Sequence, residues 1–329
     1  MFTKKDISIF SEILKKDDVL ILTHKSPDGD TLGTAFALKK MLENNGNRAC
    51  VCCSDKPSPR FSFIVDGKDL SEPEFPEKCV VSVDIATEGL LGDNMEKYAG
   101  KIDYAIDHHI TNTYYAKKTI VKPQASSAGE VLWELAKRSN IEIDDYTAAK
   151  LYTAISFDTG CFKFANVTPK TMIAAADLLK HNIPFEEINR RLFDLTTLEQ
   201  LKIENEVISK LERYCDGRIT LIYLRQETVK KYADENTDTD GLSSIPRRIE
   251  GTVVGLSLKE TPEGFVKVSL RSYDDRIDVS KVAANFGGGG HKRASGCLIK
   301  DMAFDESKKT LVSAAEKEWK RVFPNGYSE

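Results

Sequence analysis

The stretch VLILTHKSPDGDTLGTAFALKKMLENNG, residues 19–46, decides the fold of the first part of the chain. Its first six residues, 19–24, form a short apolar run that predicts a buried strand. Pro27 and Gly29 predict a turn after that strand. Residues 32–45 then carry apolar side chains at helical spacing, and the glycine that ends the stretch stops the predicted helix. A strand followed by a turn and a helix is the first half of a β-α-β unit.

Similar patterns fill the next part of the chain. Three more short apolar runs predict buried strands, at residues 48–54, 79–86 and 102–109. Ser127 and Glu130 have the spacing of a capping box, which predicts the start of a helix that runs to about Arg138. A further helix is expected over residues 146–158. Continuously apolar strands that alternate with helices predict an α/β fold with a doubly wound, mainly parallel sheet.

The later part of the chain has a different order of elements. Residues 168–213 are almost entirely helical in pattern, and a connecting helix is expected at 195–213, which contains neither glycine nor proline. A strand is expected at 218–224. Two alternating runs, at 252–258 and 265–272, flank a Pro-Glu-Gly turn and predict a hairpin. A helix, a run of four glycines, a strand and a C-terminal helix complete the pattern.

These elements predict two domains, which the length of 329 residues also favours. We expect a first α/β domain at residues 1–190 and a connecting helix or linker at 191–214. A second, smaller α/β domain is expected at residues 215–329, across a cleft from the first.

The composition is that of an ordinary globular protein, with 41% hydrophobic and 30% charged residues. The formal net charge of −4 argues against binding to long duplex DNA, because such binding depends on many basic contacts to phosphates. A local basic pocket for a very short nucleotide is compatible with this charge.

Nothing in the sequence predicts a membrane protein or an exported one. No apolar run approaches the roughly 18 residues of a membrane-spanning helix, and the N-terminal residues lack the apolar segment and cleavage site of a signal peptide. The seven cysteines form no CxxC pair, and most lie in apolar runs, which is typical of reduced, buried thiols. We therefore expect a cytoplasmic protein with no membrane partner, no disulfide framework and no Cys-ligated zinc site.

Acidic and histidine side chains gather where predicted strands and helices end. They are His24, Asp28, Asp30, Asp84, Asp107, His108, His109 and Asp158. Ligands of open α/β sheets bind beyond the carboxyl ends of the strands, where most of these side chains converge. An acid at a helix C-terminus is disfavoured by the helix dipole, so Asp158 needs another reason to be there, and a nearby cation would supply one.

Each of these features has a simpler explanation when it is taken alone. The segment around Asp28 could be a turn that caps the next helix, and Asp84 could also cap a helix. His108 and His109 could be an exposed pair. We expect these two side chains to point in opposite directions, and so to have different roles, because side chains alternate along a strand.

The combined set favours a metal site. It is rich in oxygen ligands, contains imidazoles and lacks a thiolate, which suits Mn²⁺ or Mg²⁺, with Fe or Co as further candidates, better than structural zinc. At least six candidate ligands exceed the needs of one tetrahedral ion. Two ions about 3.5–4 Å apart, bridged by a carboxylate, would use them all, activate water and stabilise phosphoryl oxygens.

A glycine-rich segment near the C-terminus predicts an anion site. Residues 285–296 have the sequence NFGGGGHKRASG. Four glycines before a helix-like start would let backbone N–H groups approach a phosphate, and His291, Lys292 and Arg293 add positive charge. The alternative is a flexible linker, although a linker is not expected between a helix and a strand of one domain. Arg271 is a second candidate anion contact, and the alternative for it is an ordinary exposed arginine on a strand.

These motifs, in this order, resemble those of the DHH phosphoesterase family, of the two-domain type that joins a DHH domain to a DHHA1 domain. The matching residues are HxxxDxD at 24–30, Asp84, DHH at 107–109, Asp158 and GGGH at 288–291. Together the motifs extend over nearly the whole chain. The compact length is most similar to that of family members that are both oligoribonucleases and phosphatases of 3′-phosphoadenosine 5′-phosphate (pAp).

The resemblance implies two divalent metal ions in the first domain, usually manganese, with magnesium or cobalt as alternatives. One ion would be held by His24, Asp28 and Asp84, and the other by Asp30, Asp84, His108 and Asp158. Asp84 would therefore bridge the ions. Asp107 would orient a ligand, and His109 would face the scissile phosphate, so that the catalytic group is Asp84, Asp107 and His109.

The resemblance also implies that the second domain binds the other end of the nucleotide. The residues concerned are Arg271, Ser272, Gly288, Gly289, Gly290 and His291. Lys25, next to the first histidine of the set, has no role in the family pattern that we can assign.

The implied function is the hydrolysis of phosphoesters in very short RNA, in dinucleotides such as pApA, and in pAp, with the cleft limiting substrate length. A RecJ-like single-strand exonuclease is an alternative, although such enzymes usually carry an added nucleic-acid-binding fold for which this chain has no spare residues. Family II pyrophosphatases lack the GGGH loop, and membrane-bound cyclic-di-AMP phosphodiesterases carry membrane and sensor segments. A non-catalytic nucleotide- or RNA-binding module is the alternative of another class, but it has no need of the acidic set. A homodimer is compatible with the sequence.

Overall fold

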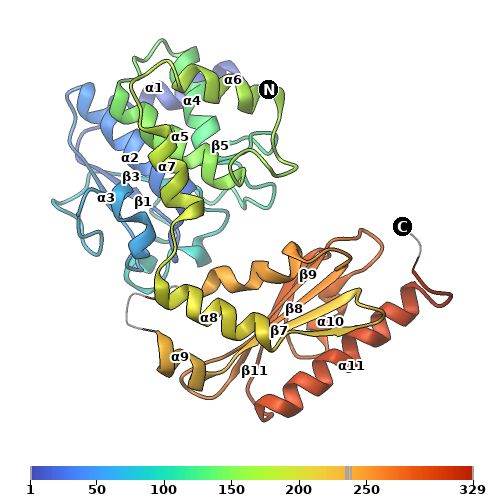
Figure 1. Cartoon of the computed structure of the whole chain (residues 1–329). Coiled ribbons are helices and arrows are strands. Elements are labelled where there is room, and N and C mark those ends of the chain that lie inside the picture. The colour runs from blue at the N-terminus through green and yellow to red at the C-terminus, as the bar shows by residue number, and fades with distance from the viewer. Residues whose placement is uncertain (1, 234–236, 238, 328–329) are drawn as a thin grey trace. The chain divides into compact units, whose positions relative to one another are not determined.

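Two compact units make up the chain. The structure is a computed structural model that describes residues 2–233, 237 and 239–327. Its first unit comprises residues 1–195 and its second residues 196–329, and Figure 1 shows both. Each unit has its own sheet and its own apolar core. No helix among the described residues is long and apolar enough to span a membrane.

The first unit is built on a parallel five-stranded sheet. Its strands are β1 (Val19–Leu22), β2 (Ala49–Cys52), β3 (Cys79–Val83), β4 (Tyr104–Asp107) and β5 (Lys118–Val121). They lie in the order β2-β1-β3-β4-β5, and Val19 pairs with both Ala49 and Cys79. The predicted doubly wound, mainly parallel sheet is confirmed. β5 lies where no strand is predicted, because it is a half-exposed strand with one buried side chain, Ile120.

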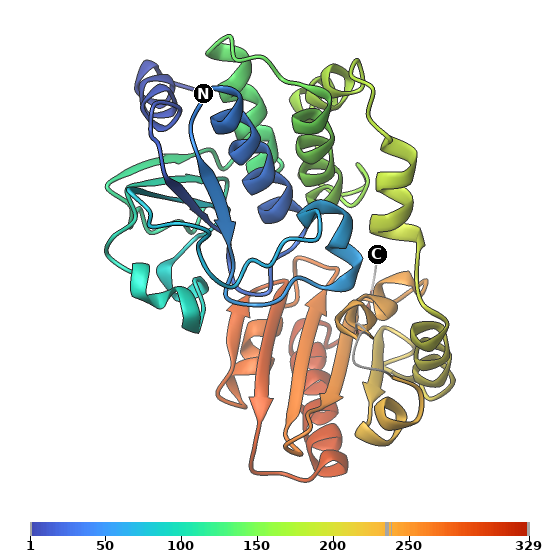
Figure 2. The ribbon, with the colours of Figure 1, turned by 90° about the vertical axis from the view of Figure 1, so that its left-hand side faces the viewer.

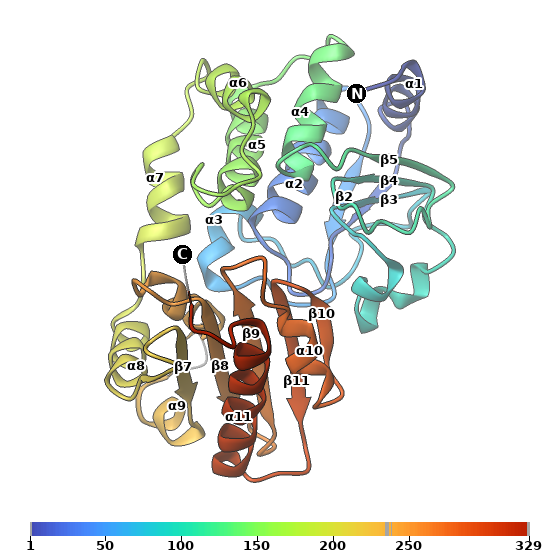
Figure 3. The same cartoon turned by 90° about the vertical axis from the view of Figure 1, so that its right-hand side faces the viewer.

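Helices cover one face of this sheet. They are α1 (Lys4–Ile13), α2 (Gly29–Asn44), α3 (Ser62–Val65), α4 (Ala128–Arg138), α5 (Asp145–Asp158), α6 (Pro169–Leu178) and α7 (Phe185–Asn189). Figure 3 shows α2, α4 and α5 along the same side of the strands, where Leu38 and Leu151 share a core with Ile21. The other face is covered by two 3₁₀ helices, η2 (Glu88–Leu90) and η3 (Asp93–Tyr98), and Met95 shares a cluster with Leu20.

The starts of two helices differ in detail from prediction. α2 begins three residues earlier than expected, at Gly29, because Asp28 caps it. At α4, the hydroxyl of Ser127 accepts a hydrogen bond from the backbone N–H of Glu130, as a capping residue does. The reciprocal half of the predicted capping box is wrong, because the Glu130 carboxylate accepts a hydrogen bond from the backbone N–H of Ser126 instead.

The second unit is built on a six-stranded mixed sheet. Its strands are β6 (Glu212–Tyr214), β7 (Ile219–Leu224), β8 (Val254–Glu260), β9 (Val266–Ser272), β10 (Gly289–His291) and β11 (Ala294–Ile299). They lie in the order β10-β11-β9-β8-β7-β6, and neighbours are antiparallel except for β7 and β8. The predicted hairpin is confirmed as β8–β9, in which Val254 pairs with Ser272.

The two faces of this second sheet are covered differently. α10 (Val279–Ala284) and α11 (Phe304–Val322) pack on one face, as Figure 3 shows, and Leu311 shares a core with Leu256 and Val268. On the other face, which Figure 2 views with the strands in front of α11 (red), helices pack near β7. These are α8 (Leu198–Ser209), α9 (Gln226–Tyr232) and the 3₁₀ segment η5 (Asp240–Arg248).

Two sequence-based expectations for this unit are wrong. The segment 195–213 is not one helix, because α8 ends at Ser209 and β6 pairs with β7. The four glycines do not precede a helix, because residues 289–291 form β10, which pairs antiparallel with β11. The glycine-rich segment is therefore part of a β-hairpin, and neither a helix N-terminus nor a linker.

The seven cysteines are free thiols. Four of them are buried, as expected, namely Cys50, Cys52, Cys53 and Cys79. The expectation is wrong for the other three, Cys161, Cys215 and Cys297, which are only partly buried.

Candidate active site

The acidic and histidine residues converge at the carboxyl ends of the central strands. His24 lies two residues after β1, Asp84 follows β3 directly, and Asp107 ends β4. The strand order reverses between β1 and β3, and open α/β sheets of this order bind ligands at that point. The cluster is completed by the first turn of α2 and the last residue of α5, which supply Asp28, Asp30 and Asp158.

Asp84 lies at the centre of the cluster. Its carboxylate oxygens are 3.7 Å from Nε2 of His24, 3.5 Å from Nε2 of His108 and 3.5 Å from Nδ1 of His109. Three groups of side chains bring candidate ligand atoms within 4.8 Å of one another: Asp84, His108 and His109; His24, Asp28 and Asp84; and Asp30, His108 and Asp158. Asp84 has a positive φ of 59°, a strained conformation that clusters at functional sites and that aspartate tolerates better than most residues.

The rings of His24 and His108 are oriented as those of metal-binding histidines usually are. Nδ1 of His24 lies 2.8 Å from the carbonyl oxygen of Lys25, and Nδ1 of His108 lies 3.3 Å from that of Ala125. Because a carbonyl oxygen only accepts, each Nδ1 carries the proton of a neutral ring. Once such a ring is neutral, as a metal requires, the lone pair of Nε2 faces the carboxylates, and the hydrogen bond at Nδ1 has already oriented the ring for the metal. Lys25 thus contributes its main chain, and its own side chain is exposed.

Asp30 is fully buried at the N-terminus of α4. Its oxygens accept hydrogen bonds from the backbone N–H groups of Ala128 at 2.7 Å and Gly129 at 3.0 Å. A helix N-terminus stabilises such a negative charge. Asp28 is held in a similar way at α2, where it accepts hydrogen bonds from the backbone N–H groups of Asp30 and Thr31. Asp28 is therefore both the helix cap of the simpler explanation and a member of the cluster.

The carboxylates and histidines shift one another's pKa values. Burial, with the charges of Asp84 and Asp158, raises the pKa of Asp30 well above its usual value. Burial also raises the pKa of Asp158 to about 7, although His108 opposes this. Burial would raise the pKa of Asp84 as well, but His108 and His24 outweigh it and lower the pKa to about 2. Burial would lower the pKa of the two histidines, but the carboxylates raise it to about 11 for His24 and about 10 for His108.

These residues fit divalent metal ions. Oδ1 of Asp84 is buried and has no hydrogen-bond partner among the described residues, although leaving such an atom unpaired is costly. The ion-pair partners found for Asp28, Asp84 and Asp158 are histidines, and a histidine that binds a metal gives up this positive charge. A set of carboxylates with imidazoles and no thiolate suits Mn²⁺ or Mg²⁺. The described residues therefore contain a cluster that could hold divalent ions.

A hydrogen-bonded chain lies beside the metal-binding candidates. Oδ1 of the buried Asp107 accepts hydrogen bonds from Nδ1 of His109 at 2.8 Å and from the backbone N–H of His108 at 2.7 Å. This contact with Asp107, helped by Asp84 and opposed by burial, raises the pKa of His109. Oδ2 of Asp107 accepts a hydrogen bond of 2.6 Å from Asn112. Sequence analysis missed Asn112, and the only signal for it is an amide in the turn after the DHH motif.

The prediction that His108 and His109 point in opposite directions is wrong. β4 ends at Asp107, so neither histidine lies in the strand and the alternation does not apply. Both rings lie near Asp84, with centroids 4.6 Å apart. Their environments still differ, because the side chain of His109 is 42% exposed and that of His108 only 15%.

In the second unit, Arg271 and His291 lie in one row across the sheet. His291 of β10 pairs with Ala294 of β11, and Ala294 pairs with Arg271 of β9. Directly paired residues share a face of the sheet. With about 4.8 Å between strands, Arg271 and His291 are roughly 10 Å apart. The structure thus brings these two predicted anion contacts to one face.

Ser272 lies away from that row. It is adjacent to Arg271 in the same strand, so its side chain is on the opposite face. The residue is 3% exposed, and its hydroxyl donates a hydrogen bond of 2.7 Å to the carbonyl oxygen of Asp274. The structure gives Ser272 a role in this turn and does not bring it together with Arg271.

The glycines before His291 are explained in part by close packing. A Cβ atom at Gly288 would lie 2.3 Å from the carbonyl oxygen of Gly296, and one at Gly290 would lie 2.6 Å from that of Ala294. Gly290 also has a φ of 136°. The tight hairpin therefore requires glycine at both positions. At Gly289 a Cβ atom would meet open space, so packing does not explain that residue.

Two family domains match the chain. The DHH family N-terminal domain matches residues 18–155, and the DHHA1 domain matches residues 222–321. The first match contains most of the candidate metal ligands, and the second contains the row of Arg271 and His291.

Relatives match over nearly the whole chain. A Streptococcus mutans protein described as a probable bifunctional oligoribonuclease and PAP phosphatase NrnA is 30% identical, over 91% of this chain and 95% of the relative. The Thermus thermophilus bifunctional oligoribonuclease and PAP phosphatase NrnA is 28% identical, over 95% and 94% of the two chains. The crystal structure of an exopolyphosphatase-related protein from Bacteroides fragilis has a TM-score of 0.87 and 25% identity, over 96% and 97%. The chain therefore belongs to the DHH family, as a protein that joins a DHH domain to a DHHA1 domain.

Proposed function

We propose that the chain is a metal-dependent phosphoesterase that hydrolyses very short RNA, dinucleotides such as pApA, and pAp. The observation that carries the proposal is the central place of Asp84, whose carboxylate faces three histidines and has one buried oxygen that no described residue hydrogen-bonds. Its support from outside the structure is the activity in the names of the Streptococcus and Thermus relatives. We also propose a cytoplasmic location, and the homodimer stays a prediction.

The metal site would use both sets of ligands that meet at Asp84. One ion would be held by His24, Asp28 and Asp84, and the other by Asp30, Asp84, His108 and Asp158. Manganese is the proposed metal, with magnesium or cobalt as alternatives. Such ions lower the pKa of water and stabilise the oxygens of a phosphoryl group.

The remaining residues would bind and orient the substrate. Nδ1 of His109 is engaged by Asp107, so Nε2 of this half-exposed ring is the atom that can donate a proton to a phosphate oxygen. The pKa of His109 is raised, which favours the charged ring that a phosphate attracts. Arg271 and His291 would bind the rest of the nucleotide. Because the three glycines at 288–290 have no side chains, the backbone of the β10–β11 hairpin would be able to approach the nucleotide closely.

A hydrolysis panel tests the proposal. The substrates are pAp, pApA, a five-nucleotide RNA, a long RNA and pyrophosphate, each with Mn²⁺ and with EDTA. We expect metal-dependent release of phosphate from pAp and of mononucleotides from the short RNAs. Processive degradation of long RNA with dinucleotides left intact would favour a RecJ-like exonuclease. Binding of these molecules without hydrolysis in any metal would leave only a nucleotide-binding module.

A further inference from the structure

The backbone of Asp84 is held in a conformation that a strand does not provide. Its φ of 59° lies in the left-handed region, directly after β3 ends at Val83. A residue other than glycine stays in such a conformation only where the surrounding structure holds it there. The backbone N–H of Asp84 donates a hydrogen bond of 2.9 Å to the carbonyl oxygen of Ile106 in β4. Further contacts of this turn come from side chains outside β3.

Two hydroxyl groups hold the backbone on either side of Asp84. The hydroxyl of Thr31, a fully buried residue in the first turn of α2, donates a hydrogen bond of 3.0 Å to the carbonyl oxygen of Val83. The hydroxyl of Tyr115 donates a hydrogen bond of 2.9 Å to the carbonyl oxygen of Ile85. The residue before Asp84 and the residue after it are therefore both held by side chains from other parts of the first unit.

The Tyr115 hydroxyl makes two hydrogen bonds with different partners. Because a carbonyl oxygen only accepts, the proton of this hydroxyl points to Ile85. The oxygen of Tyr115 then accepts the hydrogen bond of 2.8 Å from the hydroxyl of Ser82, which is fully buried in β3. One contact of Tyr115 thus reaches the turn that contains Asp84, and the other reaches only a strand side chain. The two contacts can be removed separately.

Both hydroxyl groups come from segments that carry other proposed ligands. Thr31 directly follows Asp30 in α2. Tyr115 lies in the segment between β4 and β5, which begins with His108. The two hydrogen bonds therefore connect the turn at Asp84 to two segments that carry ligands, and they fix the position of its carboxylate relative to those ligands.

We infer that Thr31 and Tyr115 are positioning residues, whose hydroxyl groups hold Asp84 in the conformation from which its carboxylate reaches both metal ions. This inference rests on the proposed function and specifies what keeps the shared ligand in place. Neither residue is itself a proposed ligand. Contacts of this kind, which orient a ligand without touching the metal, often affect metal affinity strongly.

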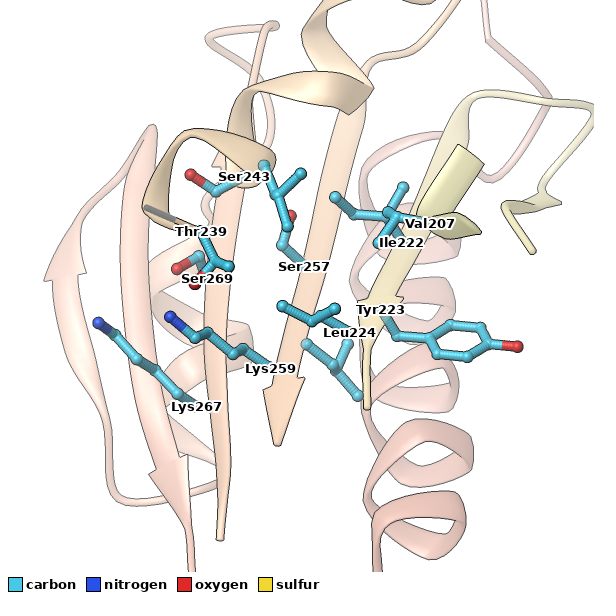
Figure 4. A pocket seen from close by; sticks show the side chains of 12 residues that line it. Val207, Ile222, Tyr223, Leu224, Thr239, Ser243, Ser257, Lys259, Lys267 and Ser269 are labelled. Atoms are coloured by element: carbon cyan, nitrogen blue, oxygen red, sulfur yellow. The ribbon is translucent and has the colours of Figure 1, made fainter. Parts of the chain in front are cut away.

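Binding of Mn²⁺ to the full chain, measured by calorimetry without substrate, tests the inference. The variants are Thr31→Val and Tyr115→Phe, each of which removes one hydroxyl group with little change of shape. The first control is Ser82→Ala, which removes the other hydrogen bond of Tyr115 and leaves the one to Ile85. The second control is Tyr223→Phe in β7 of the second unit. Figure 4 shows the hydroxyl of Tyr223 pointing away from the other labelled side chains, and it has no hydrogen-bond partner among the described residues.

We expect Thr31→Val and Tyr115→Phe each to raise the Kd for Mn²⁺ roughly tenfold, whereas both controls should keep the wild-type Kd. Urea unfolding separates positioning from a merely structural role. In EDTA, Tyr115→Phe and Ser82→Ala should both lower the unfolding midpoint, because each removes a hydrogen bond of a buried group. Excess Mn²⁺ stabilises the wild type. Only Thr31→Val and Tyr115→Phe should reduce this added stability, by about 1.4 kcal/mol per ion for a tenfold higher Kd.

A wild-type Kd for Mn²⁺ in either variant overturns the role of that residue. An equal loss of Mn²⁺ affinity in Ser82→Ala also overturns the inference, because loosening of β3 would then account for the effect. If Tyr115→Phe does not fold with the Ser82 hydroxyl left unpaired, the double variant Ser82→Ala/Tyr115→Phe takes its place. Failure of the proposed function is recognised separately, as normal Mn²⁺ binding by the wild type without hydrolysis of any substrate in the panel.

Discussion

Asn112 donates a hydrogen bond of 2.6 Å to the oxygen of Asp107 that does not contact His109. The other oxygen of Asp107 accepts the hydrogen bond from the His109 ring at 2.8 Å. The carboxylate is fully buried, and Asn112 is 7% exposed and also donates to the carbonyl oxygen of Ile85. Asn112 therefore fixes the orientation of the Asp107 carboxylate, which in turn fixes the orientation of the His109 imidazole.

Asn112→Ala should lower kcat about tenfold and leave KM nearly unchanged, because it loosens His109 without removing a substrate contact. Stability should fall by about 1.5–3 kcal/mol, the usual effect of removing a hydrogen bond to a buried charge. Steady-state kinetics with pAp and urea unfolding measure the two effects. Thr113→Ala is the control, because this exposed neighbour makes only a 3.5 Å contact with a carbonyl oxygen. A variant with wild-type kcat would contradict the role of Asn112.

Asp84→Asn should lower kcat by more than about 100-fold, because the variant loses the carboxylate shared by both proposed ions. Asparagine is chosen because it tolerates the positive φ of 59° at this position, which alanine does not. The fold should therefore survive, as a melting curve in EDTA would show. Metal analysis should find fewer bound ions than in the wild type. Substantial activity with two ions still bound would rule out the bridging role of Asp84.

Metal binding should release protons and weaken as the pH falls. The raised pKa values of His24, about 11, and of His108, about 10, mean that both rings carry a second proton at pH 7 without metal. Asp158, with a pKa of about 7, is about half protonated there. A metal needs neutral imidazoles and ionised carboxylates, so about two protons or more should leave as Mn²⁺ binds. Calorimetry in two buffers of different ionisation enthalpy measures this number, and binding without proton release would contradict the ligand set.

The sequence was sufficient to predict four of the five strands in the sheet of the first unit and the gathering of the site. Four of the parallel strands are short, fully buried and mainly apolar runs, so their composition identifies them. The carboxyl ends of parallel strands meet at one edge, and this places His24 near Asp84 although the two residues are 60 positions apart in the sequence. The topology of the sheet therefore determines most of the positions of the site residues.

Other features depend on contacts that leave no local pattern. The role of Asn112 requires a turn whose shape depends on the end of β4 at Asp107. Because the strand ends there, His108 and His109 both lie near Asp84. The glycines before His291 could equally well indicate a helix start, a linker or a hairpin, and only the pairing of β10 with β11 decides among these. The types of residue in a segment do not indicate which strand that segment will pair with.

Arg271→Ala and Ser272→Ala should have different effects although the residues are adjacent. Arg271→Ala should raise the KM for pAp by about one to two decades, since a charge-assisted hydrogen bond to phosphate contributes roughly 1.5–3 kcal/mol. Ser272→Ala should leave KM unchanged and lower stability by about 1 kcal/mol, because its hydroxyl bonds to Asp274 within a turn. Kinetics and urea unfolding of both variants provide the comparison. A large rise in KM for Ser272→Ala would show that its side chain reaches the substrate after all.

Gly33→Ala should weaken metal binding, although Gly33 is not itself a proposed metal ligand. Gly33 lies on α2, and a Cβ atom there would be 2.6 Å from the carbonyl oxygen of Lys150 and 3.1 Å from Cβ of Ala154, both on α5. α2 begins beside Asp30 and α5 ends at Asp158, so pushing the helices apart should separate these two carboxylates.

Two effects of Gly33→Ala on stability oppose each other. Alanine is favoured over glycine inside a helix by about 1 kcal/mol, but overpacking a close contact costs about 1–3 kcal/mol. The carbonyl oxygen of Lys150 is backbone and cannot rotate away, so the packing cost should win. We expect a net loss of roughly 1–2 kcal/mol in urea unfolding with EDTA and a loss of about tenfold or more in Mn²⁺ affinity by calorimetry. The control is Gly89→Ala, where the nearest atom to the new Cβ is 3.8 Å away. A Gly33→Ala protein with wild-type stability and wild-type Mn²⁺ affinity would mean that the spacing of α2 and α5 does not set the geometry of the metal site.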